Sequence, residues 1–326
     1  MKKIILFLSL FCLSLLGFAQ QDAQVTHNMF NKLAVNPGYA GSSNGICGNL
    51  LTRTQWVGLG GGPQTGILSV DGIVKKAHGG AGLTIVNDQI GQSVIDNKPS
   101  FVEKTFYIKG AYAYRQAVGP GILGVGLDLG FLQKSLEANW LTPTGGDGSE
   151  DGSIPDARVS SGSVDIGLGA YYQIPGKAYL GISSIHLQTS KLFDEKTNDS
   201  LVYKLVRNYY IMGGYEQEIT EMLTVKPSVL VKTDFASTQI EVAGLVYYNN
   251  TYWAGLNYRT VDALSLMLGY QAKINDKMNY RIGYSYDLTT SQLRTKSSGS
   301  HELLLGFCYI PQSKFKVTKY KNVRFL

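Results

Sequence analysis

The chain has 326 residues, including 38 glycines and 21 tyrosines, and its formal net charge at pH 7 is +6. Only 17% of the residues are charged, which is below the roughly 25% that is usual for soluble domains. The excess positive charge lies at the C-terminal end, so the basic composition does not indicate a nucleic-acid-binding body.

Residues 1–19 have the three regions of a signal peptide. Lys2 and Lys3 precede an apolar run that extends to Phe18, and Ala19 supplies a small residue before the expected cleavage site. The mature chain is therefore expected to begin at Gln20, outside the cytoplasm. Beyond this segment the sequence has no apolar run of the roughly 18 residues that a transmembrane helix needs.

Residues 20–44 form a separate short segment with apolar character. The apolar run that contains Met29 and Phe30 stops at Asn36-Pro37-Gly38, so it is too short for a core helix and too irregular for a strand. Proline would fix the turn, and the apolar side chains would cap a lumen or a partner surface. We interpret the segment as a plug or collar. The alternative is a flexible leader, which the apolar content disfavours.

Residues 45–310 show alternating side-chain character, which places neighbouring residues on opposite faces of a sheet. One face is apolar and aromatic, whereas the other carries glycine, serine, asparagine and scattered single charges such as Asp128. A soluble sandwich would carry dense charge on its polar face. The pattern therefore predicts an all-β, antiparallel transmembrane barrel in the outer membrane. The residues expected to face lipid include Leu123, Val125, Leu127, Tyr280, Ile282 and Tyr284.

About fourteen strands are expected, an even number that brings both chain ends to one side of the barrel. Long connections are predicted at residues 89–100, 135–161, 189–204 and 289–299, and they alternate with short ones. Outer-membrane barrels have short periplasmic turns and longer external loops. The N-terminal segment and the C-terminal tail are therefore expected in the periplasm. Because Asp128 should face inward, its replacement by asparagine is expected to be mild.

Two cysteines remain after Cys12 is removed with the signal peptide. Cys47 and Cys308 could form a disulfide in an oxidising compartment, but a lone pair so far apart in the sequence is more often two small buried hydrophobic residues. We favour the second interpretation.

No motif predicts an enzyme or a cofactor. The G-x-S-x-G pattern at 41–45 lacks the strand and helix that a nucleophile elbow requires. The four histidines, His27, His78, His186 and His301, lack the spacing of a metal site. The acidic loop 145–156 could supply oxygen ligands for calcium, but its spacing does not match an EF-hand, so a solvated loop is favoured. The glycines of GILGVGLDLG are interpreted as packing residues.

The C-terminal tail, residues 311–326, carries five basic residues and no acidic one. It is either a solvated end or an element that docks a periplasmic protein, peptidoglycan or the inner rim of the membrane. The apolar tip beside Arg324, which includes Phe325, favours docking, because an arginine and an aromatic ring suit a partner's pocket.

The chain closely resembles the PorP/SprF family of outer-membrane components of the type IX secretion and gliding apparatus in Bacteroidetes. Its opening follows a pattern like QDPxFSxYMFNxLxxNPAYAG, with departures at Ala23, His27-Asn28 and Gly38. Arg53, Gln55 and Trp56 look like the family's R-x-Q-W, residues 82–91 look like its G-L-x-x-x-x-D-x-x-G, and residues 298–302 look like its S-G-S-H-E. The opening matches are Gln21, Asp22, Met29, Phe30, Asn31, Leu33, Asn36, Pro37, Tyr39, Ala40 and Gly41.

This resemblance implies a non-enzymatic barrel that contacts periplasmic and outer-membrane proteins of the apparatus and supports export or surface attachment of an adhesin-like substrate. A passive porin for small solutes is the alternative, although many expected lumen positions lack charge. A lipid hydrolase is disfavoured because serine and histidine partners are missing. The partner-interaction candidates are Met29, Phe30, Asn36, Pro37, Tyr39, Arg53, Trp56, Arg324 and Phe325.

Overall fold

The computed structural model describes residues 22–43, 45–95, 98–137, 158–192 and 203–310. The predicted signal peptide, the acidic loop 145–156, the basic tail, Arg324 and Phe325 lie outside these ranges. Within them, no helix is long and apolar enough to cross a membrane.

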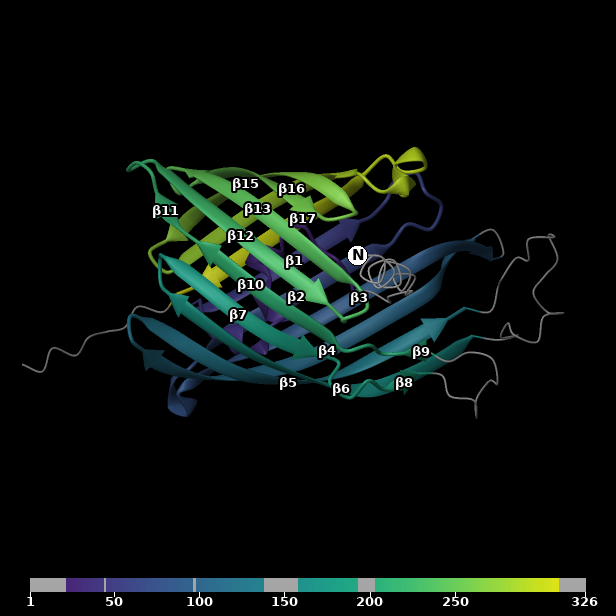
Figure 1. The fold of residues 1–326 in the computed structure, drawn as a ribbon, viewed down its shortest axis with the longest axis horizontal. Coiled ribbons are helices and arrows are strands. Elements are labelled where there is room, and N and C mark those ends of the chain that lie inside the picture. Colours follow the sequence, from purple (N-terminus) through teal and green to yellow (C-terminus); the bar gives the residue numbers. More distant parts are fainter. Residues whose placement is uncertain (1–21, 44, 96–97, 138–157, 193–202, 311–326) are drawn as a thin grey trace, which may run out of the picture.

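Fourteen antiparallel strands close into a barrel, as the alternating sequence predicted (Figure 1). The ring closes because β1 pairs with both β2 and β17, while β10 pairs with both β7 and β12. The strands are β1 (Ile46–Thr54), β2 (Gln64–Val74), β3 (Gly79–Ile95), β4 (Lys98–Val118), β5 (Gly121–Leu136), β6 (Val159–Ile174), β7 (Ala178–Ile185), β10 (Asn208–Tyr215), β12 (Leu223–Thr233), β13 (Thr238–Tyr248), β14 (Tyr252–Arg259), β15 (Ala263–Asn275), β16 (Met278–Thr289) and β17 (Ser300–Tyr309).

Short elements complete the described fold. β11 (Gln217–Glu218) extends the pairing with β12, while β8 (Lys191–Leu192) and β9 (Tyr203–Lys204) pair with each other in a separate ribbon. The 3-10 turns are η1 (Asn28–Phe30), η2 (Lys32–Ala34), η3 (Pro37–Tyr39), η4 (Lys75–Ala77) and η6 (Gln292–Thr295).

The two ends of the barrel differ in the length of their connections. We call the end that carries the connections 55–63, 137–158, 186–207 and 290–299 the long-loop end. The opposite end carries the turns 75–78, 119–120, 175–177 and 276–277, and we call it the short-turn end. The predicted long loop at 89–100 is instead a strand hairpin, because β3 and β4 stay paired out to Ile95 and Lys98. Continued pairing satisfies backbone groups that a loop would leave to water.

The outward face is apolar, as predicted. Leu127 is 50% exposed, and its neighbours Val125 and Leu129 are similarly exposed, whereas Asp128 between them is fully buried. Ile282 and Tyr284 are also exposed on this face. Because successive strand residues point to opposite sides, the same alternation places small and charged residues in the lumen.

Cys47 and Cys308 form a disulfide, so the interpretation of two separate buried hydrophobic residues is wrong. They lie directly opposite each other in the paired strands β1 and β17. A sequence separation of 261 residues hides this proximity, which exists only because the first and last strands of the barrel are neighbours.

Candidate functional site in the barrel lumen

Residues 22–43 lie inside the barrel, and we call them the plug. At the long-loop end, Asp22 accepts hydrogen bonds from Asn208 and Tyr210. At the short-turn end, the Gly41 backbone N–H donates to Asp71 of β2 at 2.8 Å. The segment is therefore not a collar at one mouth, because it follows the lumen from one end to the other. The side of the membrane that each end faces stays a prediction.

A buried network of charged residues fixes the first part of the plug. Arg53 Nη1 lies 2.8 Å from Asp287 Oδ2 and 3.3 Å from Glu302 Oε2. The backbone N–H groups of Thr26 and His27 donate to the two oxygens of Glu302 at 2.7 and 2.8 Å. His27 Nδ1 lies 2.7 Å from Glu302 Oε1. One carboxylate thus joins the plug to the barrel wall.

The network continues to β13 and β14 through Arg259. Its Nε lies 3.2 Å from Glu241 Oε1, and its Nη1 lies 2.9 Å from Asp262 Oδ2. The Asn28 side chain of the plug donates to Glu241 at 2.8 Å. This part of the plug is therefore bound to five strands, namely β1, β13, β14, β16 and β17.

Arg53 was predicted as a site residue, but Glu302 was not. The two residues face each other in the register of β1 and β17. Both residues occur in segments that resemble family motifs, R-x-Q-W and S-G-S-H-E. Their place in these motifs was the feature of the sequence that could have indicated Glu302 as a site residue. His27, which lacks the spacing of a metal site in the sequence, is fully buried in the plug, and its Nδ1 contacts Glu302.

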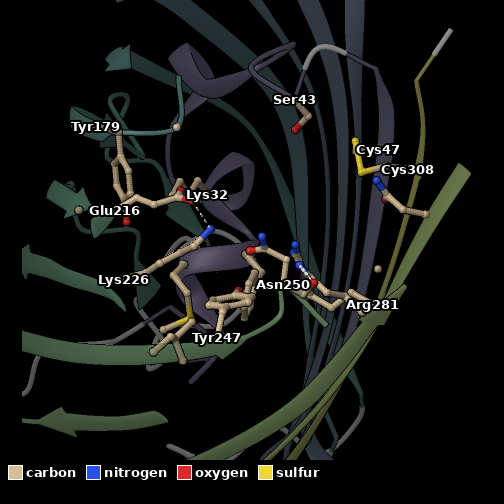
Figure 2. Close-up of a pocket in the computed structure, with 18 of the residues that line it drawn as sticks. Lys32, Ser43, Cys47, Tyr179, Glu216, Lys226, Tyr247, Asn250, Arg281 and Cys308 are labelled. Atoms are coloured by element: carbon tan, nitrogen blue, oxygen red, sulfur yellow. Dashed lines mark hydrogen bonds and ion pairs between the residues drawn. A yellow bond between two sulfur atoms is a disulfide. The ribbon is translucent and has the colours of Figure 1, made fainter. Parts of the chain in front are cut away.

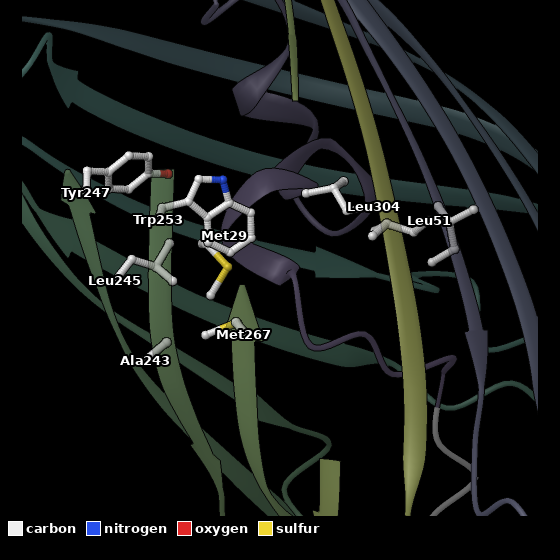
Figure 3. Packing of buried hydrophobic residues seen from close by; sticks show 9 residues of the cluster. Met29, Leu51, Ala243, Leu245, Tyr247, Trp253, Met267 and Leu304 are labelled. Carbon is white, nitrogen blue, oxygen red and sulfur yellow. The ribbon is translucent and has the colours of Figure 1, made fainter. Parts of the chain in front are cut away.

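Met29 and Phe30 anchor the middle of the plug to the wall. Met29 belongs to a buried cluster with Leu51, Met267, Trp253 and Leu304, which come from strands on different sides of the plug (Figure 3). The Phe30 ring lies 5.1 Å from the Trp253 ring between centroids. Both predicted residues therefore contact the chain's own barrel wall.

The Asn36-Pro37-Gly38 turn packs directly on backbone. The Asn36 side chain accepts from the Gly38 N–H at 2.9 Å and donates to the Ala170 carbonyl of β6 at 3.1 Å. A Cβ at Gly126 would lie 2.5 Å from the Pro37 carbonyl carbon. The packing role expected for the glycines of β5 is present here, because Gly126 lets the turn approach the wall.

Replacing Gly126 with valine is expected to push the turn away from β5 and to destabilise the protein by about 1–3 kcal/mol, the usual cost of overpacking. The free energy of unfolding in detergent micelles measures this effect. Gly110→Val is the matched control, because Gly110 faces outward and a Cβ there meets no atom within 4 Å. Equal stability of the two variants would contradict the packing.

Tyr39 and Trp56 lie at opposite ends of the lumen. The Tyr39 ring packs edge-on against Tyr171 at 5.2 Å between centroids, and its hydroxyl lies 3.0 Å from Ser43 Oγ. Burial raises the pKa of Tyr39 to about 12. The Trp56 backbone N–H donates to Ser300 Oγ at 3.1 Å, at the long-loop end. Tyr39 and Trp56 are therefore not part of one site.

His186 links the start of the plug to the wall. Its two ring nitrogens lie 2.9 Å from carboxylate oxygens of Asp22 and Asp165. Burial lowers the pKa of His186, but the two carboxylates outweigh it and raise the pKa to about 10. Burial opposes ionisation of Asp22 as well, yet His186 and Lys232 bring the pKa of Asp22 well below its usual value.

These shifts predict a pH-dependent stability. The raised His186 pKa contributes stability that is complete below the unfolded value of 6.5 and is lost as the pH rises through about 10. The lowered Asp22 pKa contributes stability above 3.8 that is lost as the pH falls. The parent protein should therefore unfold at a clearly higher temperature than the His186→Gln variant at pH 6. At pH 10 the difference between the two unfolding temperatures should be much smaller. If the difference in unfolding temperature did not change with pH, the contacts of His186 with Asp22 and Asp165 would not be the source of its raised pKa.

Cavities open at both ends of the plug. The one at the short-turn end has a volume of about 880 Å³ and includes Lys32, Tyr179, Lys226 and Arg281 in its lining (Figure 2). We call it the short-turn vestibule. The one at the long-loop end has a volume of about 450 Å³ and includes Asp22 and Trp56. The predicted residues Met29, Phe30 and Tyr39 also line the short-turn vestibule. Sequence reasoning missed its cations, because Lys32, Lys226 and Arg281 are single charges on different elements.

The sequence matches the family described as type IX secretion system membrane protein PorP/SprF over residues 17–307. The chain belongs to this family. Together with the closed barrel and its apolar outer face, membership places this PorP/SprF protein in the outer membrane. A search of curated proteins finds no match.

Among solved structures, this PorP/SprF barrel is similar to the toluene transporter TodX of P. putida, with 11% identity and a TM-score of 0.50 over 87% of this chain and 94% of that one. A TodX monoaromatic hydrocarbon channel mutant, deltaS2S3, is similar at 13% identity with a TM-score of 0.50, over 85% and 93% of the two chains. At this level of identity the likeness concerns the fold alone.

Proposed function

We propose that this barrel is a non-enzymatic interaction component of the type IX apparatus, which supports export or surface attachment of an adhesin-like substrate through contacts with periplasmic and outer-membrane proteins. The observation that carries the proposal is the bonded plug. Hydrogen bonds and ion pairs join it to β2, β6, β10, β16 and β17, among other strands. A lumen occupied in this way suits a docking platform better than a solute pathway.

The proposed orientation puts the short-turn end and the tail in the periplasm. Short periplasmic turns and longer external loops are typical of outer-membrane barrels. The last described residue, Ile310, lines the short-turn vestibule. The basic tail follows it in the sequence, so a periplasmic partner that docks on the tail would also meet the vestibule and the plug's short-turn end.

Deletion of residues 314–326 is expected to leave a folded, heat-modifiable barrel that no longer co-purifies with its periplasmic partner and no longer supports export. The double substitution Arg324→Ala and Phe325→Ala should reproduce most of the loss, because the arginine fork and the aromatic ring are the proposed anchors. Replacing Lys314 and Lys316 with glutamine is the control for charge alone. If the truncated protein still co-purified with its partner and still supported export, the docking proposal would be wrong and the tail would be a solvated end.

The alternative function, a passive porin, predicts a different conductance. A plugged interaction barrel should give little single-channel conductance in planar bilayers, whereas a porin should conduct small ions continuously. Steady conductance of the intact protein, together with unchanged secretion in a deletion strain, would favour the porin over the interaction barrel.

A further inference from the structure

We propose that the short-turn vestibule binds an acidic segment of a protein partner, whose carboxylates are held by Lys32, Lys226 and Arg281. The inference rests on the proposed function for the source of that partner and adds the chemistry that recognises it. The vestibule's volume of about 880 Å³ falls within the range of about 300–1,000 Å³ that is typical of ligand sites.

Three separate elements bring these cations together. Lys32 comes from η2 of the plug, Lys226 from β12 and Arg281 from β16, and their side chains converge on the same cavity (Figure 2). The plug is therefore part of the site. A barrel from which the plug had been removed would lose one of the three charges.

Each cation lies over an aromatic ring. Lys32 Nζ is 4.0 Å from the centroid of Tyr179, Lys226 Nζ is 4.6 Å from that of Tyr247, and the Arg281 guanidinium is 4.3 Å from that of Phe30. Such contacts position a cation and stabilise it in part, but they do not neutralise its charge. The aromatic contacts therefore leave the positive charge of each group in place.

The vestibule has too few carboxylates for its cations. Glu216 is the one acidic residue among the described residues that line it, and it pairs with Lys226 at 2.9 Å. No ion pair found in the described part of the chain includes Lys32 or Arg281. Burial, together with the charges of Arg281 and Lys226, lowers the pKa of Lys32 to about 7. A bound carboxylate would relieve this repulsion.

A protein segment suits the vestibule better than a lipid headgroup. The vestibule lies on the lumen side of the strands, whereas the outer face that meets lipid is apolar. The protein's own tail is a poor occupant, because the sequence after Ile310 carries five basic residues and no acidic one. Complementary charge instead favours an acidic partner segment.

The test uses the full-length barrel in detergent and a fluorescently labelled 12-residue peptide of alternating aspartate and glycine. Fluorescence anisotropy should report binding that weakens with salt, and the asparagine version of the peptide should not bind. Lys32→Met, Lys226→Met and Arg281→Met should each weaken binding about tenfold, the equivalent of one charged contact. Lys277→Met is the matched control, because Lys277 is exposed in a turn at the same end and does not line the vestibule.

Equal binding of the aspartate and asparagine peptides would overturn the inference, as would unchanged affinity in all three variants. Heat-modifiability on gels checks that each variant is folded. Direct binding of inorganic phosphate or anionic-lipid nanodiscs to the barrel, without binding of the acidic peptide, would assign the vestibule to phosphate groups and would also overturn the inference. Peptide binding to the purified barrel is independent of co-purification and export, so the inference and the proposed function can fail separately.

Discussion

Replacing Glu302 with alanine is expected to destabilise the barrel by about 3–5 kcal/mol, the cost of removing one partner from a buried charged pair. Glu302 is 1% exposed and accepts from Thr26, His27 and Arg53. Its loss would leave the Arg53 guanidinium near Asp287 alone and two plug N–H groups without their acceptor. The free energy of unfolding in detergent micelles measures the cost.

The same variant should also release the first part of the plug. Limited proteolysis is expected to cut near Thr26 in Glu302→Ala and to spare this region in the parent protein. Glu218→Ala is the control, because Glu218 is exposed in β11 and takes part in no ion pair described in the structure; its effect should stay within about 0.5 kcal/mol. If Glu302→Ala matched this control, the network would not hold the plug.

Replacing Leu127 with arginine is expected to destabilise the inserted barrel by about 2–4 kcal/mol, the cost of a charged residue at the lipid-facing midplane of an outer-membrane barrel. Leu127 is central in the outward row of β5 that runs from Leu123 to Phe131. Unfolding of the barrel from lipid vesicles by guanidinium measures the change.

Val118→Arg is the depth control for this prediction. Val118 is 46% exposed and is the last residue of β4, at the short-turn end of the outer face. A charge near the interface costs only about 0–1 kcal/mol. If the two arginines had equal effects, Leu127 would not lie near the middle of the membrane.

The barrel could be predicted from the sequence because strand alternation is a local signal. Leu127 and Asp128 point to opposite faces whatever the rest of the chain does, and the structure places them so. The partner of Asp128 could not be read in this way. Its ion pair with the buried Lys109, at 3.1 Å, depends on the register of β4 and β5, so Asp128→Asn is no longer expected to be mild.

The lumen was harder to predict than the wall for the same reason. Arg53 and Glu302 are distant in sequence and meet only when the first and last strands pair. Cys47 and Cys308 meet by the same closure. The path of the plug depends on how an irregular segment packs against many strands at once. A periodic sequence pattern gives no information about such packing. The predicted apolar residues Met29 and Phe30 indicated burial but not the surface that buries them.

The Cys47–Cys308 disulfide also sets how tension would travel through the molecule. Cys47 lies shortly after the plug, and Cys308 lies two residues before Ile310, where the described part of β17 gives way to the tail sequence. A pull on the C-terminal end would reach the start of β1, close behind the plug, through this one covalent link, without first breaking the hydrogen bonds between β17 and β1. In the reduced protein, the same pull would peel β17 from β1 and β16 one hydrogen bond at a time. In the oxidised barrel, the seam between the first and last strands is therefore closed by a covalent bond as well as by hydrogen bonds.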